Sequence, residues 1–160
     1  MSARVRLIGA GALVLLIAGA LGLAFANSGN GSSDPTVGKL QITGQYVTAT
    51  DNQVSAAYFT VKNHGPQDTL LTVSTNASDT ASIHEDVTKG NSSSMQLLQD
   101  LTIPPDGELV MKPGAYHVMI TNLTKPLEKG SKVSVTLKFA KAGAVTFDAP
   151  VRSITDTANQ

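Results

Sequence analysis

Four side chains in the second half of this 160-residue chain have the types and spacing to do chemistry together. They follow the pattern H-x10-M-x21-H-x-M and are His84, Met95, His117 and Met119. A set of imidazole nitrogens and thioether sulfurs suits a soft cation of low charge, and among biological metals it favours Cu(I) over zinc, iron or magnesium. The chain has no cysteine, so it lacks the thiolate that a blue-copper centre, a cysteine-based zinc site or a cysteine-ligated iron–sulfur cluster requires.

The closing pair of this pattern lies in a segment that reads as a β-strand, residues 116–121. Side chains alternate between the two faces of a strand, so His117 and Met119 share one face while the tyrosine, valine and isoleucine around them share the other. The apolar face can enter a core. An imidazole and a thioether are then left side by side on the opposite face, at a spacing that lets one ion touch both.

The same alternation applies to the segment around the first histidine. It predicts that Ile83 and Val87 face the core and that His84 faces away. In a regular strand Glu85 would point toward the core, so we expect the strand to bend or end there. Glu85 and Asp86 could also hydrogen-bond to a metal-binding imidazole and orient it, although an ordinary exposed strand end explains both acids equally simply.

The sequence around these residues resembles the periplasmic copper chaperones of the PCuAC type over residues 40–151. Three stretches carry the likeness besides the four-residue pattern: residues 57–63 (AYFTVKN), 103–105 (IPP) and 112–119 (KPGAYHVM). The resemblance implies a cupredoxin-like Greek-key sandwich and the four side chains as copper ligands. It also implies delivery of copper to the CuA centre in cytochrome c oxidase subunit II, alongside a thiol-bearing copper assembly factor. Many members have methionine after the first histidine, where this chain has Glu85.

The residues themselves favour a Cu(I) carrier that is not an enzyme. Neutral imidazoles and thioethers would hold Cu(I) without the electrostatic attraction of thiolates, which suits a protein that must release its cargo. No nucleophile and base stand at a recognisable catalytic spacing.

Met111 alternates with Leu109 and is predicted to lie in the core, although its position just before the His117 turn keeps it a possible neighbour of the site. The alternative function is a secreted β-sandwich interaction module without a metal role.

Residues 1–26 are typical of a targeting segment. Arg4 and Arg6 precede an uncharged run from residue 7 to residue 23, and Ala24 and Ala26 give the small-x-small form of a signal-peptidase site. A retained anchor is the alternative, because residues 7–26 are long enough to span a bilayer and would be the chain's only membrane contact. Both interpretations place the domain outside the cytoplasm: periplasmic, in the cell envelope or secreted. A lipid anchor would need a cysteine after the leader, and there is none.

The remainder divides into a flexible linker (27–39), a copper-binding β-sandwich (40–152) and a polar tail (153–160). Basic residues are scattered singly, so nucleic acid is not expected as a partner. Short alternating segments separated by turn residues, without a helical period after the leader, predict an all-β, two-sheet sandwich. The resemblance to the PCuAC-type chaperones implies that this sandwich has the Greek-key form. The predicted strands are residues 41–47, 56–62, 69–73, 82–87, 95–99, 108–111, 116–121, 133–139 and 145–151.

Overall fold

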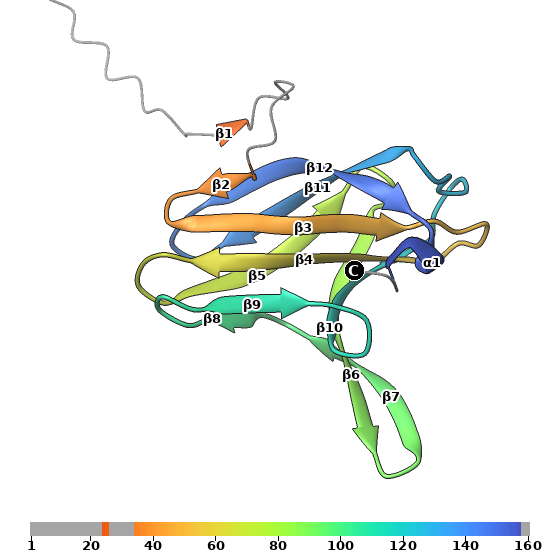
Figure 1. Ribbon diagram of the computed structural model, residues 1–160, viewed down its shortest axis with the longest axis horizontal. Coiled ribbons are helices and arrows are strands. Elements are labelled where there is room, and N and C mark those ends of the chain that lie inside the picture. Colours follow the sequence, from red (N-terminus) through yellow and green to blue (C-terminus); the bar gives the residue numbers. More distant parts are fainter. Residues whose placement is uncertain (1–23, 26–33, 158–160) are drawn as a thin grey trace, which may run out of the picture.

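The computed structural model describes residues 24–25 and 34–157 (Figure 1). Most of the predicted signal or anchor segment, the first part of the linker and the last three residues lie outside the described residues. Within the described part of the chain, no helix is both long enough and apolar enough to cross a membrane.

All nine predicted strands are present; seven are longer than the sequence pattern indicated, and residues 108–111 and 116–121 have the predicted bounds. The nine strands are β3 (Leu40–Thr48), β4 (Ser55–Asn63), β5 (Asp68–Thr75), β6 (Thr80–Lys89), β7 (Ser92–Leu98), β9 (Glu108–Met111), β10 (Tyr116–Thr121), β11 (Lys132–Phe139) and β12 (Ala144–Arg152).

Four further elements were not predicted. They are β1 (Ala24–Phe25), β2 (Thr36–Val37), β8 (Leu101–Ile103) and α1 (Ile154–Thr157). Each has only two to four residues, which is too short for a periodic pattern to be recognised.

The strands form two layers that are joined along one side (Figure 1). In the first layer the order is β7-β6-β10-β9-β4-β3, with an additional pairing of β10 to β4, and in the second it is β12-β11-β5-β8. The end of β12 crosses between the layers, because Val151 pairs with Val47 of β3 while the rest of β12 pairs with β11. The predicted all-β sandwich is confirmed.

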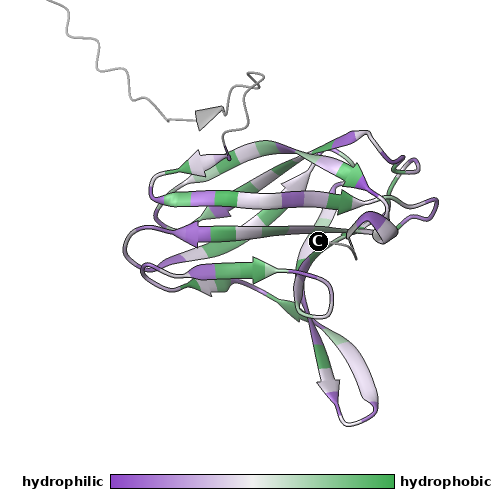
Figure 2. Ribbon diagram, viewed as in Figure 1, coloured by the Kyte–Doolittle hydropathy of each residue, from purple (hydrophilic) through white to green (hydrophobic). Residues whose placement is uncertain are grey.

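The core lies between the layers and is built by strict alternation along the strands. In β11, Val133, Val135, Leu137 and Phe139 are buried and the residues between them are not. The alternation is visible as green and purple bands along the strands (Figure 2). Burying a side chain of this size stabilises the fold by roughly 1.5–3 kcal/mol, so the inward faces of the strands determine their register.

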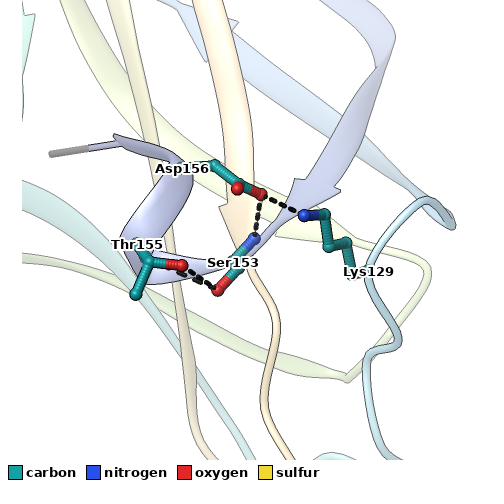
Figure 3. Close-up of polar contacts among 4 residues, drawn as sticks. All are labelled: Lys129, Ser153, Thr155 and Asp156. Carbon is teal, nitrogen blue, oxygen red and sulfur yellow. Dashed lines mark hydrogen bonds and ion pairs between the residues drawn. The ribbon is translucent and has the colours of Figure 1, made fainter. Parts of the chain in front are cut away.

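The chain end after β12 is held by polar contacts instead (Figure 3). Asp156 accepts a hydrogen bond from the Ser153 backbone N–H at 3.3 Å, and the Ser153 hydroxyl accepts one from the Thr155 N–H at 3.4 Å. These contacts cap the start of α1. Lys129 adds an ion pair to Asp156 at 2.8 Å, so the predicted polar tail begins with a short capped helix.

The hairpin of β6 and β7 projects from the sandwich (Figure 1). Strand β10 pairs with β6 only as far as Glu85, whereas β6 continues to Lys89 in unbroken register with β7. Of the two outcomes expected at Glu85, a bend or an end of the strand, the end is therefore wrong. It is the core that ends there. For the same reason Ile83 is buried but Val87, beyond the end of β10, is only half-buried.

Candidate metal centre

Strand β10 carries the core on one face and the candidate site on the other. Val118 and Ile120 are completely buried in the core. His117 and Met119 point to the opposite face, as the alternation predicted. His117 is nevertheless only 5% exposed, because the rings of His84 on β6 and Tyr58 on β4 lie beside its own. Met119 is half-buried.

The first histidine of the pattern lies directly across the ladder from the second. His84 of β6 pairs with His117 of β10, and Ser82 pairs with Met119. Residues opposite each other in an antiparallel ladder point to the same face, and the two imidazole rings are stacked with centroids 5.9 Å apart and planes 20° apart. The structure thus brings together two nitrogen donors and one thioether from distant parts of the sequence.

Met95 lies on the same face but at its margin. On β7 it pairs with Asp86, and Leu97 pairs with His84, so Met95 is diagonal to His84 across the hairpin. Its side chain is 57% exposed. The four residues of the pattern therefore share one face of three adjacent strands, with His117 at the buried end and Met95 at the accessible end.

Hydrogen bonding fixes the orientation of His117. Its Nδ1 is 3.2 Å from the carbonyl oxygen of Ala115 and 3.7 Å from Oδ2 of Asp86. Both partners are acceptors, so Nδ1 carries the proton and the neutral ring has its lone pair on Nε2. A carbonyl or carboxylate on the second nitrogen is the usual arrangement for a metal-binding histidine.

His84 contains a buried atom that lacks a partner. Its Nε2 is 2.9 Å from the hydroxyl oxygen of Ser82, whereas Nδ1 is the one buried side-chain nitrogen or oxygen without a hydrogen bond among the described residues. An unsatisfied buried polar group costs about 1–3 kcal/mol. Such an atom is expected where a ligand completes the site. Donation from Nε2–H to Ser82 would leave a free lone pair on Nδ1.

The electrostatic surroundings favour the neutral form of His84. Burial lowers its pKa, the neighbouring His117 lowers it further, and Asp86 opposes the shift. Since only the neutral imidazole can bind a metal, these effects keep the nitrogen available near neutral pH.

The structure places the three possible neighbours of the site, Glu85, Asp86 and Met111, in different positions. Asp86 lies on the site's face beside His117. Glu85 lies on the opposite face, between Tyr116 and Gln96 in the ladder. Met111 is 2% exposed in the core, as its alternation predicted, and this places it on the far side of the sheet from His117. Of the three, only Asp86 is positioned to orient a ligand.

Sequence reasoning missed an aromatic row beside the site. The ring of Tyr58 is 6.4 Å from that of His117, Tyr46 is 5.1 Å from Tyr58, and the Arg152 guanidinium lies 5.6 Å from the Tyr46 ring centroid. Burial raises the pKa of the Tyr58 hydroxyl, with smaller contributions from Tyr46 and Asp86. Both tyrosines occur in segments predicted as strands, but only the β3–β4 register shows that they face each other.

In the part of the chain that the structure describes, imidazole and carboxylate groups alone do not form a metal site. Among the residues described, no group of three or more histidine, aspartate or glutamate side chains is arranged to hold an ion. Two imidazoles therefore need further donors of another kind, and the methionines on the same face supply thioether sulfur. This donor set fits Cu(I) better than a hard cation.

Comparison with known proteins identifies the family of this chain. The family model LpqE-like, described as "Putative lipoprotein LpqE-like", matches residues 40–151. A relative from Leifsonia xyli subsp. xyli (strain CTCB07), "Putative lipoprotein Lxx21020", is 33% identical over 115 residues, which cover 71% of this chain and 69% of that protein.

Solved structures with the same fold include several PCuAC domains. The copper-bound PCuAC domain from PmoF2 has a TM-score of 0.63 at 26% identity, covering 76% of this chain and 98% of that one. The apo PCuAC domain from PmoF1 has a TM-score of 0.62 at 28% identity, covering 76% and 99%. CuI-DR1885 from Deinococcus radiodurans has a TM-score of 0.56 at 26% identity, covering 71% and 79%. The chain therefore belongs to the LpqE-like family, within the group of PCuAC-like proteins.

Proposed function

We propose that this chain is an extracytoplasmic Cu(I) carrier, which binds the ion through His84, Met95, His117 and Met119 and transfers it to an acceptor protein. The observation that carries the proposal is the pairing of His84 with His117, with ring centroids 5.9 Å apart and one buried nitrogen lacking a partner. The fold shared with the copper-bound PmoF2 domain and with CuI-DR1885 supports it.

The arrangement of donors is suited to release as well as to capture. The ligands are neutral, so Cu(I) is held without the added attraction of thiolates. Met95 is accessible on the projecting hairpin, whereas His117 is buried. An acceptor can therefore approach from the Met95 side and replace ligands one at a time. The role is one of binding and transfer, without catalysis.

The proposed acceptor rests on the family resemblance alone. We propose delivery to the CuA centre of cytochrome c oxidase subunit II, with a thiol-bearing copper assembly factor as a second partner. The names of the family and of the Leifsonia relative describe lipoproteins, which supports a location outside the cytoplasm. These 160 residues contain no cysteine for lipid attachment, so we propose that the N-terminal segment directs export or anchors the chain.

The test is a Cu(I) titration against a colorimetric chelator under anaerobic conditions. The parent chain should take one equivalent, and His117→Ala and Met119→Ala should lose it. His64→Ala is the matched control, because His64 is exposed in a turn and distant in sequence from the site. A parent chain that takes no Cu(I) would contradict the proposal and favour the interaction-module alternative.

A further inference from the structure

Strand β7 forms an unprotected edge of the first layer. It is the end strand of the sheet order and pairs only with β6 among the described residues. Its seven residues, Ser92–Leu98, contain no charged residue and no proline. Proteins usually protect exposed edges with lysine, proline or a bulge, because an open edge accepts another strand. This edge has none of these features.

The edge also exposes apolar side chains. Met95 and Leu97 are 57% and 56% exposed, and they are two of the three large hydrophobic side chains exposed among the described residues. They are two positions apart, so they share a face. That face is the one that carries His84, since His84 pairs with Leu97.

The outer half of the hairpin is short of partners. Beyond Glu85, strand β6 leaves β10 and is paired with β7 alone, and this part projects from the body of the molecule (Figure 1). An isolated two-stranded hairpin is at best marginally stable in water, and a third strand is normally needed. The accessible side of β7 is where such a strand can be added.

We propose that the third strand is β7 of a second copy of this chain, paired antiparallel about a two-fold axis at Gln96. In this register Met95 of each copy lies beside Leu97 of the other, so the two apolar side chains contact each other laterally while the face that carries His84 stays open to an acceptor. Centring the axis on Met95 would place Leu97 opposite Ser93, and centring it on Leu97 would place Met95 opposite Gln99. Both registers leave a large apolar side chain facing a polar one.

Charge favours a second copy as the occupant. Identical strands can face each other here without repulsion, because Ser92–Leu98 carries no charge. The proposed pairing uses only strand residues, because Gln99 and Asp100 lie beyond the end of β7. The contact is isologous and closes on itself as a dimer.

The absence of cysteine allows a direct test on the full-length, copper-free chain. In Gln96→Cys the two new thiols face each other across the two-fold axis, at a Cα separation of about 4.5–5.5 Å, which is within disulfide range. In Ser94→Cys, the matched control, the same thiols are about four residues apart along the strand, roughly 13 Å. Oxidation with diamide and a non-reducing gel distinguish the two cases.

We expect Gln96→Cys to become mainly a covalent dimer, Ser94→Cys to stay monomeric, and the double variant Ser94→Cys/Leu98→Cys to cross-link again. Strongest bridging at any other position of residues 92–98 would overturn the proposed pairing. So would no bridging at any of these positions while each thiol still reacts with maleimide, which would assign the edge to a different partner. The readout involves no copper, so its failure is distinct from failure of the carrier function.

A charge variant provides a second measurement. Gln96→Lys places two lysines opposite each other at the axis, and we expect the monomer–dimer midpoint measured by light scattering to rise at least tenfold. Ser94→Lys, which faces Leu98, should raise it less. Gln96 points away from the face of His84, so Cu(I) uptake should be unchanged. Equal effects of the two lysines would argue against the two-fold at Gln96.

Discussion

At the scale of single residues, the candidate site is defined by what each histidine nitrogen contacts. His117 is oriented by two acceptors near Nδ1, the Ala115 carbonyl and the Asp86 carboxylate. His84 has one nitrogen bonded to Ser82 and the other without a partner. Both rings are therefore held in position before any ion arrives, so little ordering remains to oppose binding.

Removing the carboxylate of Asp86 should weaken copper binding without removing a ligand. We expect Asp86→Asn to lower Cu(I) affinity by about 10–100-fold, because acceptors behind a metal-binding imidazole raise its basicity and fix its orientation. Competition titration at constant pH measures the change. Glu85→Gln is the control, since Glu85 lies on the other face of the same strand. An equal loss in both variants would mean that strand charge in general, and not the contact with His117, is responsible.

The lowered pKa of His84 predicts a pH dependence of stability for the copper-free chain. Unfolded His84 binds a proton at a pKa of about 6.5, whereas the folded form binds it only at lower pH. Between these values the unfolded state carries more protons, so the free energy of unfolding should fall as pH decreases below about 6.5. Urea denaturation at several pH values measures the slope. His84→Gln should reduce that slope, and an unchanged slope would exclude His84 as its source.

The same proton should compete with the metal. Cu(I) affinity is expected to fall as pH decreases from about 6.5 toward the lowered pKa of His84, because protonated imidazole cannot bind. Chelator competition at neutral pH and near pH 5 gives the comparison. Affinity that does not change over this interval would count against two histidine ligands.

At the scale of elements, the hairpin of β6 and β7 gives the site one accessible edge. The buried end of the site is made by β10, which is paired on both sides, and the exposed end by β7, which is paired on one. The ligands should therefore differ in reactivity according to the strand that carries them.

Oxidation should follow this difference in exposure. Peroxide converts a thioether to a sulfoxide, and we expect Met95 to react before the half-buried Met119 and long before Met111, which is in the core. Mass spectrometry of peptides taken at intervals gives the order, and parallel titrations should show Cu(I) affinity falling as Met95 is modified. Tight binding that persists after both Met95 and Met119 are oxidised would remove them from the site.

An element could be predicted from the sequence when the pattern that specifies it lies within its own residues. The alternation of residues 133–139 specifies a strand with one buried face, and β11 has that face in the core. Three residues are too few to show a period, so β8 was missed. The expected end at Glu85 was wrong because a strand's own pattern does not show where its neighbour stops, and here β10 stops before β6 does.

The same limit applies to the candidate site. The two faces of β10 follow from alternation, so the positions of His117 and Met119 relative to the core could be predicted. The facing of His84 and His117 and the row formed by Tyr58 and Tyr46 depend on pairing between distant segments, which no local pattern contains. Copper binding by these residues remains a prediction, which the titration tests.

At the scale of the whole molecule, the two layers have separate tasks. The layer with β10 and β6 carries the candidate site, and the layer with β11 and β12 closes the core beneath it. Stability and copper binding should therefore be separable by mutation.

A truncation in the second layer should show this separation. Leu137 of β11 is completely buried, and Leu137→Ala should lower the free energy of unfolding by about 2–5 kcal/mol, because it removes buried apolar atoms and leaves a cavity. Urea denaturation measures the loss. The chain that remains folded should still take up one equivalent of Cu(I), and a folded variant with lost stoichiometry would show that the layers are coupled.

Strand β10 alternates core residues with site residues, so correct pairing of this strand and correct placement of the metal donors depend on each other. A slip of one residue in its pairing would expose Val118 and Ile120 to water while turning His117 and Met119 into the core. The register that buries the apolar side chains is therefore the same register that places the metal donors correctly. A sheet paired out of register loses both its core and its metal donors. An incorrectly folded chain would compete poorly for scarce copper, so occupancy by the ion would report that folding has succeeded.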